Sequence, residues 1–309
     1  MIKILKTLCA ICLLAGTLTA CGPEQSTPPT APPSTSKLSV VVSFNAMKEL
    51  AQAVGGDAVE IHSIVPDGVE PHEFEPKATD LTALKNARVF ILNGLDLEHS
   101  WSDKTIQAAG NSNLMVITAS DGTQAITSTE QGLFRHQNHR AQRDPHIWLS
   151  LDGAAIESRN IRDAFIQADP DHADTYRKNY DVFAVSLHQL HDEYATKFSQ
   201  SPRKDFVTGH AAFSYTAREF GLTQHGLESV FSSGEPSARR LKELADYSKT
   251  HHIYTIFIEN MENPKIAQTL ANEVGAVVED LNTLESSEGD THYIDTMREN
   301  LEKIYQSLQ

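Results

Sequence analysis

The sequence predicts an α/β protein with two lobes, each built on a mostly parallel sheet, and one long helix that joins them. Short β-branched runs alternate with helical apolar spacing over residues 38–169, and the alternation restarts after residue 201. Strands separated by helices favour a parallel sheet with helices on both faces. Residues 170–200 carry one uninterrupted helical pattern instead. We therefore expect a ligand site in the cleft between the lobes, beyond the carboxyl ends of strands.

The first 20 residues have the features of a secretory signal peptide. Lys3 and Lys6 precede an apolar stretch from Leu8 to Leu14, and small residues lead to Cys21. The apolar stretch is shorter than the ~20 residues that cross a bilayer. The sequence Leu-Thr-Ala-Cys resembles a bacterial lipobox, which implies that Cys21 is acylated and becomes the first residue of an exported, lipid-anchored protein.

Residues 21–37 are expected to form the acylated cysteine and a tether. They are rich in Pro, Ser and Thr and contain almost no large apolar side chains, so they have nothing to contribute to a core. The other two cysteines, Cys9 and Cys12, lie inside the signal, and the exported chain keeps no pair that could form a disulfide. Its stability must come from a packed core.

The charge of the exported chain is strongly negative. Removal of the two signal lysines leaves 24 basic against 41 acidic residues, a net charge of −17. Nucleic acids and anionic lipid surfaces are poor partners for such a chain, and we expect membrane attachment only through the lipid. The charge suits a cation, although an acidic surface also serves solubility.

The individual elements follow from composition and spacing. The run LSVVVS at residues 38–43 predicts a strand, and residues 44–54 predict a helix that ends at Gly55-Gly56. The same criteria predict further strands at 59–65, 88–93, 114–118, 206–208, 253–258 and 276–279. They predict further helices at 79–86, from about 152, at 211–220, at 237–249 and at 264–274.

The helix predicted at residues 170–200 is the longest. It contains neither Gly nor Pro between its ends, and large apolar residues recur at steps of three or four. These residues are Tyr176, Tyr180, Phe183, Leu187, Leu190, Tyr194 and Phe198. They form one apolar stripe of about six turns, on a helix that is expected to join two lobes, residues 38–169 and residues 201–309.

Three histidines occupy loops next to predicted strands or helices. His72 lies between two prolines in PHEFEP, which restricts its backbone. His146 lies in DPHIWL, where Trp148 can exclude water and Asp144 can accept a second ring N–H from a ligand histidine. His210 directly follows the strand at 206–208, in GHAAFSY.

Each of these histidines by itself is also compatible with an ordinary loop residue. Together they form a set of three neutral imidazoles, which suits Zn²⁺ and would not select Ca²⁺ or Mg²⁺.

The order of these motifs resembles the zinc and manganese substrate-binding lipoproteins of ABC importers, the cluster A-I or cluster 9 family. The matching segments are P-H-x-[FY]-E-P, D-P-H-x-W-L and H-x-A-F-x-Y, then Phe-Gly-Leu at 220–222 and Glu-Pro-Ser at 235–237. The resemblance covers essentially everything after the tether. It implies two lobes with a single connecting helix, metal ligation by His72, His146 and His210, and zinc capture for an ABC permease and its ATPase. We expect a monomer, not an enzyme.

The fourth ligand is left open by the resemblance. Many relatives carry an Asp in a segment resembling L-D-P-L, and here the segment reads L-N-T-L with Asn282 at that position. Asp280, Glu279 or a water could take the place, and a carboxylate restored at position 282 would add an oxygen ligand. Manganese-binding relatives use two histidines and two carboxylates, so the third histidine favours zinc over Mn²⁺ or iron.

Other histidines are weaker candidates. His136 and His139 lie where zinc-type relatives insert a His-rich loop, but arginines surround them and oppose cation binding. His188 and His191 have i, i+3 spacing on the long helix and could form a surface metal pair. Glu259, after the strand at 253–258, is a possible second-shell acceptor for a ligand histidine.

Two other functions remain as alternatives. A zinc hydrolase also uses three histidines and a water, but the motif H-E-x-x-H is absent from the sequence. A surface adhesin lipoprotein is the other alternative, although no motif requires it.

Overall fold

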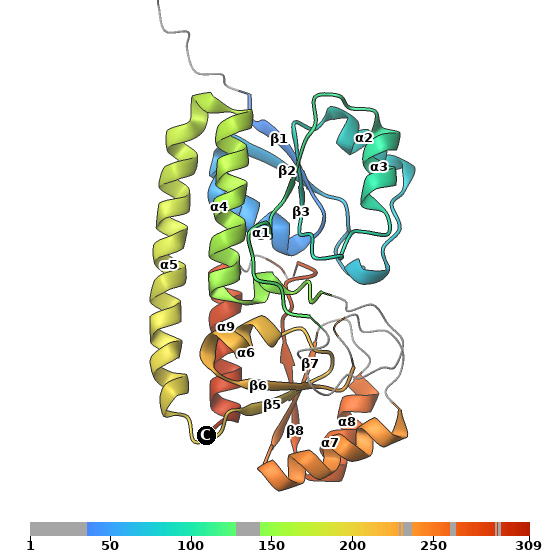
Figure 1. The fold of residues 1–309 in the computed structure, drawn as a ribbon, viewed down its shortest axis with the longest axis vertical. Coiled ribbons are helices and arrows are strands. Elements are labelled where there is room, and N and C mark those ends of the chain that lie inside the picture. The colour runs from blue at the N-terminus through green and yellow to red at the C-terminus, as the bar shows by residue number, and fades with distance from the viewer. Residues whose placement is uncertain are drawn as a thin grey trace, which may run out of the picture. The chain divides into compact units, whose positions relative to one another are not determined.

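The first lobe contains a four-stranded sheet in the order β2-β1-β3-β4, and every pairing in it is parallel (Figure 1). The computed structural model describes residues 36–127, 143–228, 230, 237–259, 264–287, 289 and 292–309. The elements of this lobe are β1 (Leu38–Val42), α1 (Asn45–Gly55), β2 (Val59–Ser63), α2 (Ala78–Asn86), β3 (Val89–Leu92), α3 (Ser102–Ala109) and β4 (Met115–Thr118). The predicted alternation is confirmed, and α3 is a helix that the sequence pattern did not predict.

The second lobe repeats this arrangement with a parallel sheet in the order β6-β5-β7-β8. Its elements are β5 (Asp205–Thr208), α6 (Ser214–Phe220), β6 (Thr223–Gly226), α7 (Ala238–His251), β7 (Thr255–Glu259), α8 (Pro264–Val274), β8 (Val277–Leu281) and α9 (Tyr293–Ser307). The short edge strand β6 and the C-terminal helix α9 were not predicted. Both lobes belong to one compact unit, Ser34–Gln309.

Two long helices, α4 (Leu151–Ala168) and α5 (Ala173–Gln200), run side by side along one side of the molecule, and α5 extends past both lobes (Figure 1). A short 3-10 turn at Pro170–His172 reverses the chain between them. The helix predicted at 170–200 is therefore confirmed from residue 173 onward. Because Pro170 lacks a backbone N–H and restricts φ, it suits the turn before the helix better than the helix interior.

The predicted apolar stripe of α5 is where the two lobes meet this helix. Its members Tyr176, Phe183, Leu187, Leu190, Tyr194 and Phe198 are buried. Helix α5 contacts α1 of the first lobe and both α6 and α9 of the second. One continuous helix thus makes apolar contacts with both lobes. These contacts hold the two lobes in position on either side of the cleft.

The N-terminal predictions and part of one motif lie outside the described residues. These are the signal at 1–20, the lipidation site Cys21, most of the tether, the pair His136 and His139, and Glu235-Pro236. Among the helices of the described residues, none combines the length and apolar character needed to cross a membrane.

Candidate metal centre

His72 reaches the cleft from the loop after β2. It lies in a 3-10 turn, Pro71–Glu73, and its backbone N–H donates to the Glu70 carboxylate over 3.1 Å. Pro71 occupies the first position of the turn, where a missing N–H costs no hydrogen bond. The side chain of His72 is only 3% exposed. The sequence therefore presents this imidazole on a restricted backbone, as its proline neighbours predicted.

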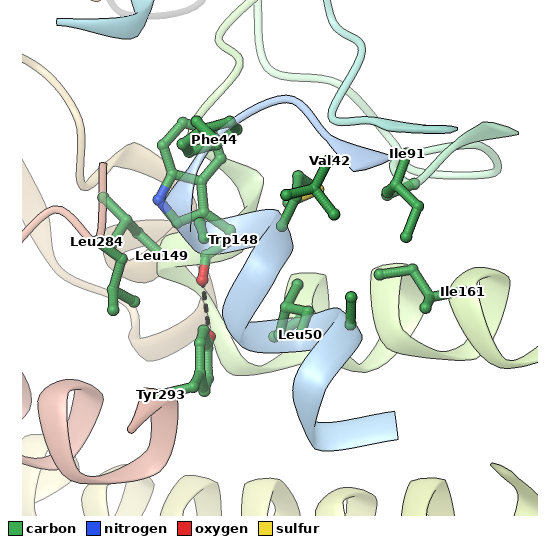
Figure 2. Packing of buried hydrophobic residues seen from close by; sticks show 14 of the residues in the cluster. Val42, Phe44, Leu50, Ile91, Trp148, Leu149, Ile161, Leu284 and Tyr293 are labelled. Carbon is green, nitrogen blue, oxygen red and sulfur yellow. Dashed lines mark hydrogen bonds between the residues drawn. The ribbon is translucent and has the colours of Figure 1, made fainter. Parts of the chain in front are cut away.

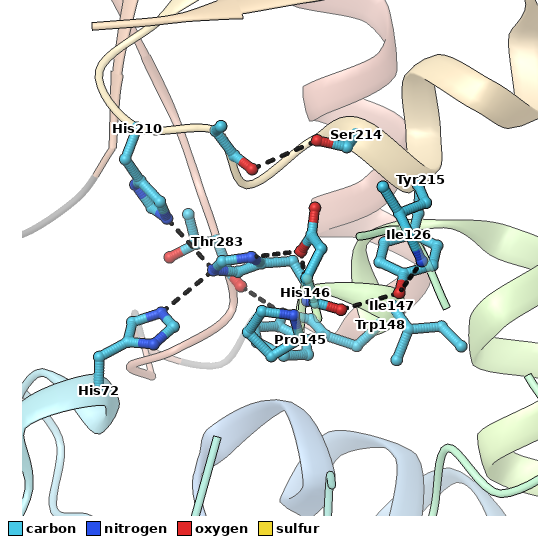
Figure 3. A network of polar contacts seen from close by, with 12 residues as sticks. His72, Ile126, Pro145, His146, Ile147, Trp148, His210, Ser214, Tyr215 and Thr283 are labelled. Atoms are coloured by element: carbon cyan, nitrogen blue, oxygen red, sulfur yellow. Dashed lines mark hydrogen bonds and ion pairs between the residues drawn. The ribbon is translucent and has the colours of Figure 1, made fainter. Parts of the chain in front are cut away.

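His146 enters the cleft directly after Pro145 and before the 3-10 turn Ile147–Leu149, and its side chain is fully buried. The carboxylate of Asp144 lies 2.9 Å from its Nδ1 and 3.0 Å from its backbone N–H. A carboxylate on Nδ1 fixes the tautomer and leaves Nε2 free to act as a ligand atom. The Tyr215 hydroxyl donates to the backbone carbonyl oxygen of Asp144 over 2.8 Å and so holds this residue in place (Figure 3).

The turn with His146 packs tightly on the start of α4. A Cβ on Gly153 would collide with the carbonyl oxygen of Ile147, and Gly153 donates its N–H to the N-cap residue Ser150. Only glycine permits this approach, which sets the distance between α4 and the ligand loop.

His210 follows β5 at the carboxyl end of the second sheet. Its backbone N–H donates to Oε2 of Glu259 over 3.2 Å, and its Nδ1 lies 3.7 Å from the same oxygen. Gln224 donates to the carbonyl oxygen of His210 over 3.1 Å. Glu259, at the end of β7, therefore has the position that an outer-shell carboxylate of a ligand histidine requires.

Glu285 is a fourth functional side chain, and the sequence analysis missed it. It follows β8 and is 97% buried, since only 3% of it is exposed. Asn282 accepts the N–H of Leu284 through its side chain, and Leu284 has a left-handed backbone with φ of 59°. This Asx turn directs the next residue toward the histidines. The Thr283 hydroxyl donates to Oε2 of Glu285 over 2.7 Å and orients the carboxylate.

The three imidazoles and the Glu285 carboxylate converge (Figure 3 shows the three histidines). Nε2 of His146 lies 3.1 Å from Nε2 of His72 and 3.3 Å from Nε2 of His210. Oε1 of Glu285 is 3.4 Å from His72 Nε2 and 3.7 Å from His146 Nε2. A tetrahedral cation with bonds of about 2.0–2.1 Å separates its ligand atoms by about 3.3–3.4 Å. These four residues, here called the interlobe site, can therefore hold a metal ion.

Burial and contacts between neighbouring groups shift the pKa values of the side chains in the site. Burial lowers the pKa of His72 despite its contact with Glu285. Burial also opposes protonation of His146, but the carboxylates of Asp144 and Glu285 outweigh it and raise the pKa of His146. Burial opposes ionisation of Glu285, yet His146 and His72 hold its pKa well below the usual range. The site thus carries an ionised carboxylate among imidazoles that a cation would need in neutral form.

Glu70 adds a second titrating carboxyl close to the site. Burial and the charge of Glu285 raise the pKa of Glu70 to about 7. Its Oε1 lies 4.0 Å from Nε2 of His72, and 36% of its side chain is exposed. Above pH 7 this group adds negative charge beside the imidazoles, which favours a bound cation.

The expected candidates for the fourth position lie elsewhere, which corrects the sequence analysis. Glu279 and Asp280 are both exposed, and Asp280 pairs with Lys303 at 2.9 Å. The Asn282 side chain shapes the turn before Glu285. The carboxylate that lies with the histidines is Glu285, the residue directly after the segment that resembles L-D-P-L. A carboxylate just after the last strand of the second sheet was the available signal.

Aromatic side chains pack beside His146 in the interlobe site. Trp148 is fully buried, its ring centroid lies 5.1 Å from that of His146, and Phe44 packs edge-on against it at 4.8 Å (Figure 2 shows Phe44 and Trp148). The Trp148 Nε1–H donates to the carbonyl oxygen of Thr283 over 2.7 Å, and the Tyr293 hydroxyl donates to the carbonyl oxygen of Trp148 over 2.7 Å. Trp148 thus lies buried beside His146 and links the His146 turn to the Glu285 turn.

Comparison with known protein families identifies the family of this chain. Residues 40–307 match the family model described as zinc-uptake complex component A, periplasmic. The chain belongs to this family. Members of the zinc-uptake component A family are metal-binding components of ABC importers, and they are not a known enzyme family.

Two curated relatives of this family member match over most of their own length. A Treponema pallidum protein named for metal binding is 41% identical over 278 residues, which cover 88% of each chain. The high-affinity zinc uptake system protein ZnuA of Bacillus subtilis is 33% identical over 310 residues, 97% of this chain and 95% of the relative.

The fold of this family member is shared with solved structures. The laminin-binding protein Lmb of Streptococcus agalactiae, described as bifunctional with adhesin and metal-transporting activity, superimposes with a TM-score of 0.79. It is 36% identical, and the match covers 88% of this chain and all of that chain.

Proposed function

We propose that this protein captures zinc outside the cytoplasmic membrane and delivers it to an ABC importer. The observation that carries the proposal is the buried interlobe site, where Nε2 atoms from both lobes and one carboxylate oxygen stand at tetrahedral separations. The zinc uptake protein ZnuA of Bacillus subtilis is similar over 97% of the chain.

Zinc is favoured over manganese by the kind of ligand atom. His72, His146 and His210 would supply three neutral nitrogens, and Glu285 would add a single carboxylate. Imidazole suits zinc, whereas Mn²⁺ prefers sites dominated by oxygen. Asp144 and Glu259 would support two of the imidazoles from outside, which raises their basicity as ligands.

Metal analysis tests this proposal directly. Protein purified without chelator is expected to contain one zinc per chain by inductively coupled plasma mass spectrometry, and little manganese. The His72→Ala/His210→Ala double variant, purified alongside, is the control for adventitious metal. Equal zinc content in the two preparations would overturn the assignment of the site, and a predominance of manganese would overturn the choice of metal.

A transport role, and not hydrolysis, follows from the closed ligand set. A catalytic zinc keeps one coordination position for water, whereas four protein donors fill a tetrahedral shell. Glu285 in the fourth position therefore favours storage and release of the ion. Zinc-loaded protein is expected to leave peptide, ester and lactam substrates intact.

The partner that we propose is an ABC permease with its ATPase, which this protein would meet as a monomer. Radioactive zinc uptake by vesicles that contain the permease is expected to require this chain. The His146→Ala variant should not support uptake, and uptake with this variant at the wild-type rate would contradict delivery from the interlobe site.

We also propose that Cys21 anchors the mature protein by acylation. Removal of residues 1–20 would leave the tether to residue 37 between the lipid and two lobes, 38–169 and 201–309, joined by the helix at 170–200. Mass spectrometry of the N-terminal peptide tests this. A diacyl or triacyl Cys21 is expected, and an unmodified Cys21 in membrane-fraction protein would refute it.

A second candidate function is adhesion, because the structurally similar Lmb protein combines adhesin and metal-transporting activity. Binding of zinc-loaded protein to immobilised laminin, against a collagen surface as the control, tests it. No binding at micromolar protein would leave metal capture as the single proposal.

A further inference from the structure

A second group of metal-ligand side chains lies on the outer face of α5. It consists of His188, His191 and Asp192, here called the α5 cluster, and each offers a ligand atom within 4.8 Å of the other two. These residues stand at positions i, i+3 and i+4, which are neighbours on one face of a helix. His188 and Asp192 are 76% and 64% exposed at their side chains, and His191 is 30% exposed. The cluster is therefore open to ions from solution.

The Asp192 carboxylate already lies between the two imidazoles. Its Oδ2 is 3.5 Å from Nε2 of His188, and its Oδ1 is 3.4 Å from Nδ1 of His191. The two rings are parallel within 8°, with centroids 6.4 Å apart. Ligand atoms around a tetrahedral zinc are separated by about 3.3–3.4 Å. Small rotamer adjustments would thus bring all three around one ion.

Helix α6 restrains one member of the cluster. The His191 ring stacks on Phe220 at 5.4 Å, and its Nε2 lies 4.0 Å from Oε1 of Glu219. The Glu219 carboxylate also accepts the N–H groups of Leu151 and Asp152 at the start of α4, so its position is held. A ligand that is restrained before the ion arrives loses less conformational entropy on binding.

The charge along this part of α5 also favours a cation. Residues 179–196 contain no Lys or Arg, while the Asp192 carboxylate supplies negative charge between the two imidazoles. The segment around His136 and His139 has the opposite charge in sequence, because arginines stand at positions 135, 140 and 143. Like charges near a site disfavour a bound cation, so α5 is the better candidate of the two.

We infer that the α5 cluster is a second, weaker site for an imidazole-preferring divalent cation such as Zn²⁺, with His188, His191 and Asp192 as ligands, Glu219 beside them and water in the remaining positions. The set of two nitrogens and one carboxylate oxygen suits zinc, cobalt and nickel better than Mg²⁺ or Ca²⁺. Among the described residues it has no fourth protein ligand, and only one neighbouring carboxylate, Glu219, lies near its imidazoles. Outer-shell partners are worth about 10–100-fold each in affinity. We therefore expect binding at least about 100-fold weaker than at the interlobe site.

Titration of full-length protein whose interlobe site already holds one equivalent of zinc tests the inference. Calorimetry with further ZnCl₂ is expected to show a second, weaker binding step in the wild type. The His188→Gln/His191→Gln double variant should lose this step and keep the first, and Asp192→Asn should weaken it. The matched control is His251→Gln/His252→Asn, which changes another exposed histidine pair and should keep both steps. Thermal melts verify that all variants are folded.

A paramagnetic ion gives the location independently. Cobalt(II) added to ¹⁵N-labelled, zinc-loaded protein should shift and broaden amide signals of residues 185–195 and 219–220 before others. A second step that persists in the double variant, the absence of a second step in the wild type, or broadening centred on the loop around His136 and His139 would each overturn the inference.

Discussion

The interlobe site and the α5 cluster use similar donors, but they differ in where the donors come from. The first draws His72, His146, His210 and Glu285 from four loops that lie far apart in the chain. The second takes its three donors from little more than one helical turn. Burial separates them further, because the interlobe donors are almost fully buried whereas His188 and Asp192 are exposed. Spacing alone can bring ligands together, but burial and outer-shell carboxylates make a site selective.

The largest difference between the two sites is expected when one imidazole is removed from each. His210→Ala should weaken zinc binding more than about 100-fold, beyond the loss caused by an outer-shell change. His188→Ala and His191→Ala should leave the tight step unchanged. Competition with a chromophoric chelator measures all three, and equal losses in the three variants would contradict the assignment of the interlobe site.

The carboxylate of the interlobe site gives the next effect. Glu285→Gln removes an ionised ligand but keeps the side-chain shape, and zinc affinity should fall about 10–100-fold. The control is Asp280→Asn, which neutralises a nearby exposed carboxylate that pairs with Lys303. Similar losses in both variants would point to a general effect of negative charge instead of ligation by Glu285.

Acid should weaken the interlobe site as well. A ligand imidazole must be neutral, and the contacts of His146 with Asp144 and Glu285 raise its pKa, so protons compete for it at higher pH than for an ordinary histidine. Glu70, with a pKa of about 7, also loses its charge as the pH falls. Zinc affinity is expected to fall at least about tenfold between pH 7 and pH 5, given the imidazole reference of ~6.5. A constant affinity over this range, measured by calorimetry, would indicate a site dominated by carboxylates.

The smallest effect is expected at Asn282. The resemblance of its segment to L-D-P-L suggested that an aspartate here would add a ligand. In the structure the Asn282 side chain accepts the N–H of Leu284, and an aspartate can accept the same bond. Asn282→Asp should therefore change zinc affinity within about twofold, equivalent to about 0.5 kcal/mol. A larger rise for manganese than for zinc would show that this side chain reaches the ion after all.

Periodicity was enough to predict most of the fold, because apolar spacing reports which face of each element is buried. The stripe of α5 is the best example, since Tyr176, Leu187 and Phe198 are all buried as expected. Edge strand β6 was missed because its sequence TQHG (Thr223–Gly226) is polar and ends in a glycine, which hides a strand. Helix α9 has a clear apolar face, formed by Tyr293, Met297, Leu301 and Ile304, so its spacing did carry a helical signal that the prediction did not use.

The candidate site could be predicted in part. Histidines next to prolines or directly after strands are visible in sequence, and His72, His146 and His210 do converge. Glu285 could not be identified in the same way, because its approach depends on the left-handed backbone of Leu284 and the Asx turn at Asn282. A non-glycine residue in that region gives no clear sequence signal. Which of several nearby carboxylates faces the cleft is decided by backbone geometry.

The continuity of α5 limits how the cleft can open. This helix of 28 residues is about 42 Å long and contains no Gly or Pro, and it contacts helices of both lobes. Hinge motion requires a few residues that absorb a large change in φ and ψ, and α5 provides none. We therefore expect the lobes to move little as rigid bodies, and the ion to enter and leave through displacement of the loops that carry His72 and Glu285. The ion would then dissociate slowly from the free protein and quickly only when a partner displaces those loops. The partner, and not the affinity of the site alone, would set the rate of release.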